Sequence, residues 1–385
     1  MTSIRDSVHG YIQLGEEELG LVDSQAFQRL RRVRQLGLTS LVYPSATHTR
    51  FQHSLGVMHL AERFGESLDL RDGEVEKVKL AALLHDTGHG PFSHASENVI
   101  EKHGLRHEDF SCEVIDRLED RYSADASELR DIIRGESRLG QVVAGDVDAD
   151  RMDYLIRDSQ SSGLEHGKID YETIIRLAEM RDGELVFDVK AVDALEALLS
   201  SRFHMRKTLY NHKTAVIAEK MLQRAIDRYI SQGNSLEEFM RMDDYRADQA
   251  LRRSGSEAVR TLYRRIRRRN LFKEALVLGE DKLGRKRLRE LEKEVRQPKK
   301  LEAEIAEELG IEAYEVIVKP PETPELQQLD INVLKNGDMR PLSDFTSLPE
   351  SLKEAEWRTA ALRVYTPEKH VEDVGSVAGS VVESF

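Results

Sequence analysis

Residues 85–94 read His85-Asp86-Thr-Gly-His89-Gly-Pro-Phe-Ser-His94. Apolar residues recur at helical spacing in the preceding segment, residues 74–84, and the glycines and the proline of the quoted stretch are typical of a helix end. We therefore expect His85 and Asp86 to lie at the end of a helix, with both side chains facing a cleft. The pair predicts a helical catalytic core.

Further histidines and aspartates occur on both sides of this pair. Ten of the thirteen histidines fall within the first 166 residues. A lone helical histidine is usually structural, but several buried imidazoles and carboxylates without partners would be expensive. Two histidines and two aspartates also leave coordination positions open for water and a phosphate oxygen, as metal-assisted hydrolysis requires. The predicted metal ligands are His53, His85, Asp86 and Asp150.

The ligand types limit the metal. Imidazole and carboxylate suit a divalent ion such as Mn, Fe, Co, Ni or Mg, and the sequence does not choose among these. A thiolate site is excluded because Cys112 is the only cysteine. A single cysteine also fits a reducing compartment.

Composition sets the outer bounds. The chain has 385 residues, of which 39% are hydrophobic, so it can build one large core and a smaller lobe. Its net charge of -13 gives no global attraction to nucleic acid or to an anionic membrane. No apolar run approaches the ~20 residues of a membrane helix, and the first residues lack a signal-peptide pattern. We expect a cytoplasmic protein that does not bind membranes.

The predicted fold is mainly α, with a smaller C-terminal α+β lobe. Helical spacing dominates residues 19–270, whereas short apolar segments separated by proline and glycine follow residue 311 and indicate strands. The tail offers little apolar surface to bury, so we expect it to be disordered. The predicted divisions are a helical core at 1–235, a charged helical extension at 236–310, an α+β lobe at 311–370 and a disordered tail at 371–385.

Proton transfer needs a group near the metal. One imidazole must protonate the leaving alkoxide, and a carboxylate behind it would fix its tautomer. His94 with Glu97 or His107 suits this role, although a structural hydrogen bond is the alternative. His89 lies on a glycine-flanked turn, where it suits phosphate contact as well as proton transfer, and the sequence does not separate the two roles.

Arginines near the ligands are candidates for holding phosphates, because a guanidinium binds phosphate oxygens in a bidentate way. Arg50 is three residues from a predicted ligand and Arg151 is adjacent to one. Arg202 and Lys213 lie further along the chain, where a solvated helix face explains them nearly as well.

A basic stretch at 252–273 contains Tyr263 and a run of arginines at 264–269. It is a candidate for binding single-stranded nucleic acid. We favour a solvated or subunit-contacting helix face, because one aromatic residue is a poor stacking platform.

Four segments in this order resemble the HD-domain deoxynucleoside triphosphate triphosphohydrolase family: Asp23-Ser-Gln-Ala-Phe-Gln28-Arg-Leu-Arg31, Gln35-Leu36-Gly37, Arg50-Phe-Gln-His53-Ser-Leu-Gly56 and residues 85–94. The most similar subgroup comprises the catalytic HD part of the SAM-and-HD-domain protein and its prokaryotic relatives. The resemblance implies a metal-dependent hydrolase that attacks the α-phosphorus of a dNTP and releases a deoxynucleoside and intact triphosphate.

The resemblance also implies roles for individual residues. His94 would be the acid for the 5′-oxygen, supported by His107 and Glu97. Phosphates would be held by Arg50, His89, Arg151 and Arg202. The sugar 3′-hydroxyl would be held by Gln35, Tyr154 and Asp158, while Leu36 and Tyr210 would crowd the 2′ carbon and so exclude a ribose.

In regulated members of the family, residues matching Asp23, Gln28 and Arg31 bind the guanine of an activator at a subunit interface. The resemblance therefore implies GTP or dGTP as an effector and a homo-oligomer, a dimer or a tetramer. A helix-capping Asp23 and a salt-bridged Arg31 are the structural alternative.

Two other functions stay open. One is an HD phosphohydrolase that acts on another nucleotide, such as a cyclic nucleotide, an alarmone or a nucleoside monophosphate. The other is a nucleotide-gated protein that binds single-stranded nucleic acid through residues 252–273.

Overall fold

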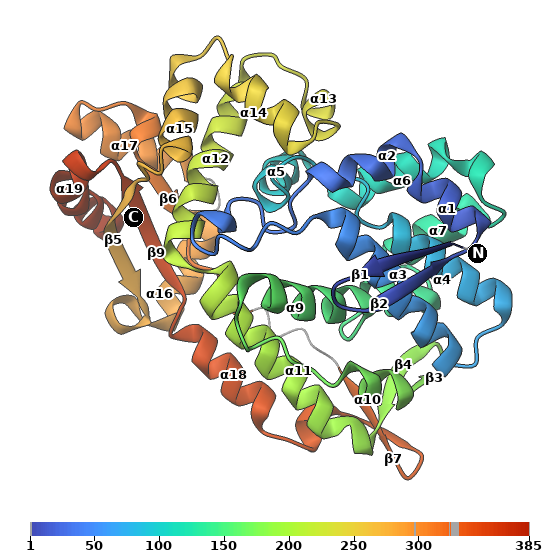
Figure 1. Cartoon of the computed structure of the whole chain (residues 1–385). Coiled ribbons are helices and arrows are strands. Elements are labelled where there is room, and N and C mark those ends of the chain that lie inside the picture. The colour runs from blue at the N-terminus through green and yellow to red at the C-terminus, as the bar shows by residue number, and fades with distance from the viewer. Residues whose placement is uncertain (1, 296–297, 323, 325–330, 385) are drawn as a thin grey trace. The chain divides into compact units, whose positions relative to one another are not determined.

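A computed structural model of the chain describes residues 2–295, 298–322, 324 and 331–384. The chain forms two compact units, each assembled from separate stretches of sequence. Figure 1 shows their helices and strands. The first unit comprises Met1–Tyr210, Asn234–Gln249 and Leu329–Ser347, and the second comprises Asn211–Gly233, Ala250–Gln328 and Leu348–Phe385.

The first unit is mainly helical. Its elements are β1 (Thr2–Asp6), β2 (Gly10–Leu14), α1 (Glu16–Val22), α2 (Gln25–Arg29), α3 (Arg50–Ser67), α4 (Asp72–Leu84), α5 (His94–Ile100), α6 (His107–Arg117), α7 (Ala126–Ile133), α8 (Gln141–Ala144), α9 (Ala149–Ser162), α10 (Tyr171–Arg176), β3 (Ala178–Arg181), β4 (Glu184–Asp188), α11 (Val192–Met205), α13 (Leu236–Met240), β7 (Asn332–Lys335) and β8 (Asp338–Pro341).

The second unit combines helices with a small sheet. Its elements are α12 (Lys213–Ser231), α15 (Glu257–Arg267), β5 (Lys273–Gly279), α16 (Glu280–Glu294), α17 (Lys299–Leu309), β6 (Ile317–Lys319), α18 (Leu348–Trp357), β9 (Ala361–Thr366) and α19 (Val371–Ser384). Helix α14 (Asp244–Arg252) begins in the first unit and ends in the second. A mainly α fold with small sheets in its C-terminal part confirms the predicted class.

Helix α3 lies at the centre of the first unit, where it packs against α4 and α9 (Figure 1). It begins after Thr49, whose backbone N–H donates to Oε1 of Gln52 at 2.9 Å and so satisfies a free donor of the first turn. Helix α9 begins after Asp148, whose carboxylate accepts from the N–H of Arg151 at 2.7 Å. These caps set the positions at which the side chains of both helices leave the backbone.

Helix α4 ends at Leu84, directly before the His85-Asp86 pair, as the sequence predicted. The chain then turns closely over α6. A Cβ atom at Gly88 would lie only 2.1 Å from the carbonyl oxygen of His107, so no larger residue fits this turn without moving α6. Glycine at this position therefore fixes the path of the loop that follows the pair.

The strands are distributed differently from the prediction of one α+β lobe at 311–370. Strand β7 pairs in parallel with β4, within the four-stranded sheet β3-β4-β7-β8 of the first unit. Strand β9 pairs with β6 on one side and on the other with β5, which falls inside the segment predicted as a helical extension at 236–310. The prediction failed here because the β4–β7 and β5–β9 pairings join segments far apart in the sequence, which local patterning does not reveal.

The tail also differs from the prediction of disorder at 371–385. Residues Val371–Ser384 form α19, and Val374, Ala378 and Val382 are buried in the core of the second unit. Their spacing of four residues places them on one helix face, so the tail does have apolar surface to bury. Among the described residues, none of the helices combines the length and the apolar character that a bilayer span requires.

Candidate functional site

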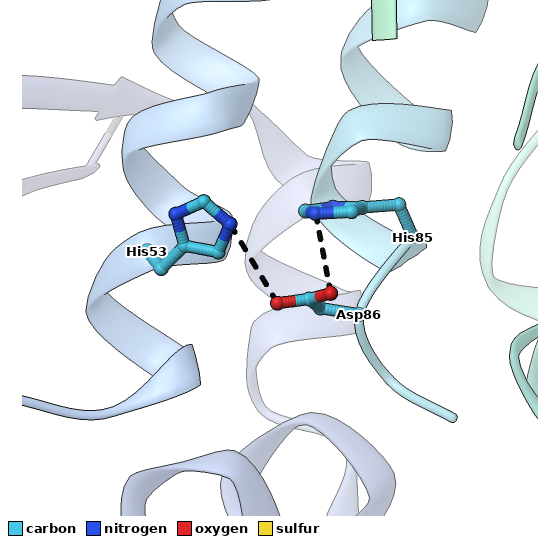
Figure 2. A group of neighbouring side chains, drawn as sticks. All are labelled: His53, His85 and Asp86. Carbon is cyan, nitrogen blue, oxygen red and sulfur yellow. Dashed lines mark ion pairs between the residues drawn. The ribbon is translucent and has the colours of Figure 1, made fainter. Parts of the chain in front are cut away.

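Side chains from three helices of the first unit converge on one point. His53 lies on α3, His85 and Asp86 directly follow α4, and Asp150 lies on α9. Nε2 of His53 is 3.6 Å from Oδ2 of Asp86, and Nε2 of His85 is 3.4 Å from Oδ1 of the same carboxylate (Figure 2). Oδ1 of Asp150 lies 2.8 Å from Nε2 of His53 and 3.8 Å from Nε2 of His85. The four residues predicted to be ligands thus lie together.

The arrangement fits a divalent cation. Nδ1 of His85 hydrogen-bonds the carbonyl oxygen of Ala82 at 2.7 Å, which leaves Nε2 facing the carboxylates. That buried Nε2 has no hydrogen-bond partner within the described part of the chain. The ligand atoms of His53, His85 and Asp86 all lie within 4.8 Å of one another. A buried ring nitrogen without a partner, next to carboxylate oxygens, is a site that a metal ion satisfies.

The charges of the cluster favour ionised carboxylates. Burial alone would raise the pKa of Asp86, but Arg50 and the neighbouring histidines hold it well below its ordinary value. Burial would lower the pKa of His53, yet hydrogen bonds with Asp150 and Asp153 raise it to about 10. Without a cation, positive charge on His53 and Arg50 therefore balances the carboxylates.

A second layer of side chains holds His53 in place. Oδ2 of Asp153 lies 2.8 Å from Nδ1 of His53, and Oδ1 lies 2.7 Å from Nε2 of His9. Arg157 donates through Nε to Oδ2 of Asp153 and through Nη1 to Oδ2 of Asp6, both at 2.8 Å. The bond to Nδ1 directs Nε2 of His53 towards the ligand cluster, as outer partners of metal-binding histidines do.

Sequence reasoning assigned no role to this second layer. The available signal was spacing, because Asp153 lies three residues after Asp150 and Arg157 four residues further, all on one face of α9. Close helix packing is also required. A Cβ atom at Gly56 of α3 would lie 1.9 Å from Oδ1 of Asp153, so glycine is what lets the carboxylate reach this position.

Arg50, predicted to bind phosphate, contacts the ligand cluster. Its Nη1 donates to Oδ2 of Asp86 at 2.6 Å, and its Nε donates to Oγ of Ser93 at 2.8 Å. Its Nη2 is buried and has no hydrogen-bond partner among the described residues. One face of the guanidinium is therefore paired, while Nη2 is left for another acceptor.

The four candidate acid–base residues form one group beside the cluster. Nδ1 of His107 lies 2.5 Å from Oε1 of Glu97, and Nδ1 of His94 lies 3.5 Å from its Oε2. The ring of His89 stacks on that of His107, with centroids 3.8 Å apart, and its Nε2 is 3.3 Å from Oδ1 of Asp86. The side chain of His94 is 54% exposed, so it is the most accessible to a ligand.

Their environments push the pKa values apart. Burial is the main cause that lowers the pKa of His89, to about 3, with repulsion from Arg50 in the same direction. Burial also opposes protonation of His107, but Glu97 raises its pKa above the ordinary value. At neutral pH, His89 is therefore an uncharged imidazole, while Glu97 favours the protonated form of His107.

Three of the residues predicted to contact the sugar, Asp158, Tyr210 and Tyr154, lie together. Tyr210 donates its hydroxyl to Oδ2 of Asp158 at 2.8 Å, and His48 lies 2.7 Å from Oδ1. The rings of Tyr154 and Tyr210 meet edge to face, with centroids 6.2 Å apart. Burial, followed by the neighbouring carboxylate, raises the pKa of Tyr210 well above its ordinary value, so its hydroxyl remains a donor.

Gln35 and Leu36 lie on the segment before α3, and both are buried. The N–H of Gln35 donates to the carbonyl oxygen of His48 at 3.1 Å, which links this segment to the partner of Asp158. Oε1 of Gln35 has no hydrogen-bond partner within the described residues. It is a buried acceptor that a ligand hydroxyl would satisfy.

The remaining basic candidates differ in position. Burial raises the pKa of Tyr154 to about 12, and the positive charges of Arg202 and Arg151 oppose part of this rise. Both arginines therefore act electrostatically on a residue predicted to contact the sugar. Arg151 is also paired with Asp146. Lys213 lies in the second unit, where it forms an ion pair with Glu274.

The predicted effector residues lie on the first unit, around α2. Arg31 donates to Oε1 of Gln28 at 2.9 Å and covers the ring of Phe51, with its Cζ 3.6 Å from the ring centroid. Gln28 donates to the carbonyl oxygen of Val22 at 2.9 Å. Asp23 is exposed beside them. Gln28 and Arg31 are thus brought together at the surface.

The basic stretch at 252–273 is helical over α15. Tyr263, its candidate stacking residue, is only 4% exposed and belongs to the core. Arg265 lies over the ring of Phe272, with its Cζ 5.3 Å from the centroid, and donates to Asn270. A buried tyrosine provides no platform on which bases can stack.

Two family models match the chain. The model described as HD domain matches residues 50–198, and the model described as HD associated region matches residues 169–383. All four predicted metal ligands fall within the first match. The second covers α10, α11 and most of the second unit, and residues 1–49 lie outside both matches.

Curated relatives extend the likeness. An uncharacterized protein of Methanocaldococcus jannaschii is 35% identical, over 97% of this chain and 81% of its own. A deoxynucleoside triphosphate triphosphohydrolase SAMHD1 homolog of Dictyostelium discoideum is 31% identical, over 73% of this chain. The human SAMHD1 enzyme is 28% identical, over 64% of this chain. The chain spans 61% and 45% of the lengths of these last two proteins.

Solved structures with the same fold cover nearly the whole chain. A hypothetical protein from Aquifex aeolicus has a TM-score of 0.80 at 33% identity, over 98% of this chain and 99% of its own. A phosphohydrolase from Bacteroides thetaiotaomicron has a TM-score of 0.77 at 28% identity, over 96% of this chain and 100% of its own.

Proposed function

The chain belongs to the HD-domain family of phosphohydrolases, and from this membership we propose that it hydrolyses dNTPs to a deoxynucleoside and inorganic triphosphate. The observation that carries the choice of substrate is the hydrogen bond between Tyr210 and Asp158. It belongs to the same unit as the ligand cluster, and α9 carries both Asp150 and Asp158. Helix α9 would thus contribute both to the contact for a sugar and to the metal site for a phosphate.

The metal site would be formed by His53, His85, Asp86 and Asp150. Which of Mn, Fe, Mg, Co or Ni they hold is left to measurement, because the ligand types suit them all. A divalent ion, when bound, polarises a phosphoryl oxygen and acidifies water, which is the chemistry that hydrolysis of a phosphoanhydride or ester requires. The unpartnered Nε2 of His85 supports this assignment.

His94 would donate the proton to the 5′-oxygen of the leaving deoxynucleoside. It is the most exposed member of its group, and Oε2 of Glu97 lies 3.5 Å from its Nδ1. Glu97 also pairs with His107 and so is held in position from both sides. His89, held uncharged by burial, would donate a hydrogen bond from its ring N–H to a phosphate oxygen.

Arginines and the sugar pocket would orient the rest of the substrate. Arg151 and Arg202 would neutralise the triphosphate, and the free Nη2 of Arg50 would add a further donor. Gln35, Tyr154 and Asp158 would bind the 3′-hydroxyl. Leu36 and Tyr210 would occupy the space next to the 2′ carbon, so that a ribose 2′-hydroxyl clashes or stays unpaired.

Product analysis tests the proposal. Purified protein is incubated with Mn²⁺ or Mg²⁺ and each dNTP or NTP, and the products are separated by ion-pair chromatography, with Asp86→Ala as the control. We expect deoxynucleoside and triphosphate from dNTPs, and neither product with Asp86→Ala. Monophosphate and pyrophosphate, or no turnover of any dNTP, would contradict the proposal and favour a cyclic nucleotide, an alarmone or a monophosphate as substrate.

A guanine nucleotide is the proposed effector, bound by Asp23, Gln28 and Arg31 between subunits of a homo-oligomer. The exposed Asp23 beside the Arg31–Gln28 pair supports this. Activity and oligomer mass are measured with and without GTP or dGTP. We expect both to rise with the nucleotide, and neither to rise in Arg31→Ala. Unchanged activity and mass in the wild type would contradict this part of the proposal while leaving the hydrolytic reaction intact.

A further inference from the structure

A cavity of about 290 Å³ borders the loop that follows the His85-Asp86 pair. The backbone of Thr87 and Gly88 forms one wall, and the others come from α2, α6 and the segment 240–246. None of the residues assigned above to the metal, the substrate or the effector lines it. All of its walls belong to the first unit.

The cavity is strongly basic in an otherwise acidic protein. Its two carboxylates are already paired, Asp243 with Arg32 at 2.6 Å and Glu113 with Arg241 at 3.2 Å. Five guanidinium groups face two carboxylates, an excess of three positive charges, whereas the whole chain carries -13. The lining arginines are Arg29, Arg32, Arg117, Arg241 and Arg246.

Two of these arginines have donors to spare. Within the described part of the chain, no carboxylate lies at ion-pair distance from Arg117 or Arg246. Arg117 uses only Nε, which donates to the carbonyl oxygen of Glu113 on its own helix at 3.1 Å. Both side chains belong to exposed residues, so their guanidinium groups are accessible at the mouth of the cavity.

The floor of the cavity is apolar. Phe110, Val114 and Met240 line it and are buried, with exposed fractions of 6%, 4% and 1%. An apolar floor below several guanidinium groups suits a ligand that combines phosphate with a less polar body. A solvated helix face would explain the arginines but not the apolar residues that line the same cavity.

We propose that this cavity binds a phosphate-bearing small molecule, held by Arg32, Arg117 and Arg246. Its occupancy would act on the hydrolytic site through the shared wall. Nη2 of Arg29 donates to the carbonyl oxygens of Thr87 and His89, at 2.8 and 2.7 Å, and its Nη1 donates to that of Met242 at 2.7 Å.

Both terminal nitrogens of Arg29 therefore join the loop to the segment that contains Met240. A ligand that shifts the floor would move the loop carrying Asp86 and His89, and so change turnover. The shared ligand chemistry is a polyphosphate, either inorganic or part of a nucleotide.

Calorimetric titration of the full chain tests the site. Inorganic triphosphate and ATP serve as probes at low ionic strength and without divalent metal, in the double variant Arg151→Ala/Arg202→Ala, which lacks two of the proposed phosphate contacts of the hydrolytic site. We expect binding to persist in this background. Adding Arg117→Ala and Arg246→Ala should weaken it by about tenfold or more, because two charge-assisted contacts are lost.

The matched control adds Arg176→Ala and Arg181→Ala, which remove the same charge from exposed positions of the first unit and should leave the affinity unchanged. Equal affinities for the two probes assign recognition to the phosphates, and tighter ATP binding assigns it to a nucleotide; either supports the site. Binding already lost in the Arg151→Ala/Arg202→Ala background, or equally affected by the control, overturns it. The outcome is independent of which nucleotide the enzyme hydrolyses.

Discussion

Nη1 of Arg50 lies 2.6 Å from Oδ2 of Asp86, and both side chains are buried. The same oxygen is 3.6 Å from Nε2 of His53, so the guanidinium occupies one side of a carboxylate whose other side faces the ligand cluster. The fold tolerates burial of these two opposite charges because the guanidinium and the carboxylate form an ion pair with each other. The first unit therefore carries a positive charge of its own beside the position that a cation would take.

Arg50→Met tests this relationship, because methionine retains much of the aliphatic packing and removes the charge. We expect the free energy of unfolding of the metal-free protein to fall by about 3 kcal/mol, since Asp86 is left buried without its partner. Saturating Mn²⁺ should recover part of the loss by supplying positive charge. Urea unfolding in EDTA and in Mn²⁺ measures both effects. An equal loss in both buffers would mean that the arginine acts only by packing.

Asp153→Asn tests the second layer. The variant keeps every proposed metal ligand but weakens the bond that orients His53, so we expect the affinity for Mn²⁺ to fall by roughly 10- to 100-fold. Asp6→Asn is the matched control, because it also removes a carboxylate from Arg157 but does not touch His53. Titration of the metal by calorimetry compares them. Similar affinities in the two variants would indicate a general effect of the Arg157 network.

The proposed ligands were predictable because their chemistry is visible in residue type. A histidine and an aspartate side by side at a helix end, His85 and Asp86, can be recognised from local sequence alone. The end of α4 followed from Gly88 and Gly90 in the same way. Local sequence patterns therefore predict those site residues that lie within one continuous segment.

The partners of these residues were not predictable, because they depend on contacts between distant segments. The bond from Arg157 to Asp6 spans 151 positions, and the pairing of Asp158 with His48 spans 110. The pairing of β7 with β4 likewise depends on contact between distant segments. No periodicity within a helix or strand carries such information, since each segment is compatible with several neighbours until the whole unit packs.

Glu97→Gln gives a pH-dependent prediction. Burial alone would raise the pKa of Glu97 above 4.5, but the neighbouring histidines hold it below that value, and the carboxylate in turn raises the pKa of His107 above 6.5. A lowered carboxyl pKa stabilises the fold above about pH 4.5, and a raised imidazole pKa stabilises it below about pH 6.5. Both contributions are fully present between these values, so the loss of stability in Glu97→Gln should be largest there.

Two measurements check this prediction. Urea unfolding at a series of pH values should give the largest difference from wild type between pH 4.5 and 6.5, and a smaller one on either side. NMR titration should show that His107 loses its proton at lower pH in the variant. Glu113→Gln, an exposed change on α6, serves as the control. A difference that is constant with pH would mean that the Glu97–His107 contact contributes no net electrostatic energy.

Tyr210 separates two ways of rejecting a ribonucleotide. Tyr210→Ala removes both the ring and the bond to Asp158. The ratio of kcat/KM for GTP to kcat/KM for dGTP should then rise by roughly tenfold or more, because the side chain that clashes with a 2′-hydroxyl is gone. Tyr210→Phe keeps the ring and removes only the hydroxyl; if the ring is what crowds the 2′ position, its ratio should stay near wild type while KM rises. Steady-state kinetics on both nucleotides distinguishes them. A ratio in Tyr210→Ala equal to wild type would remove Tyr210 from sugar selection, whereas a rise of the same size in both variants would assign the selection to the Asp158 hydrogen bond.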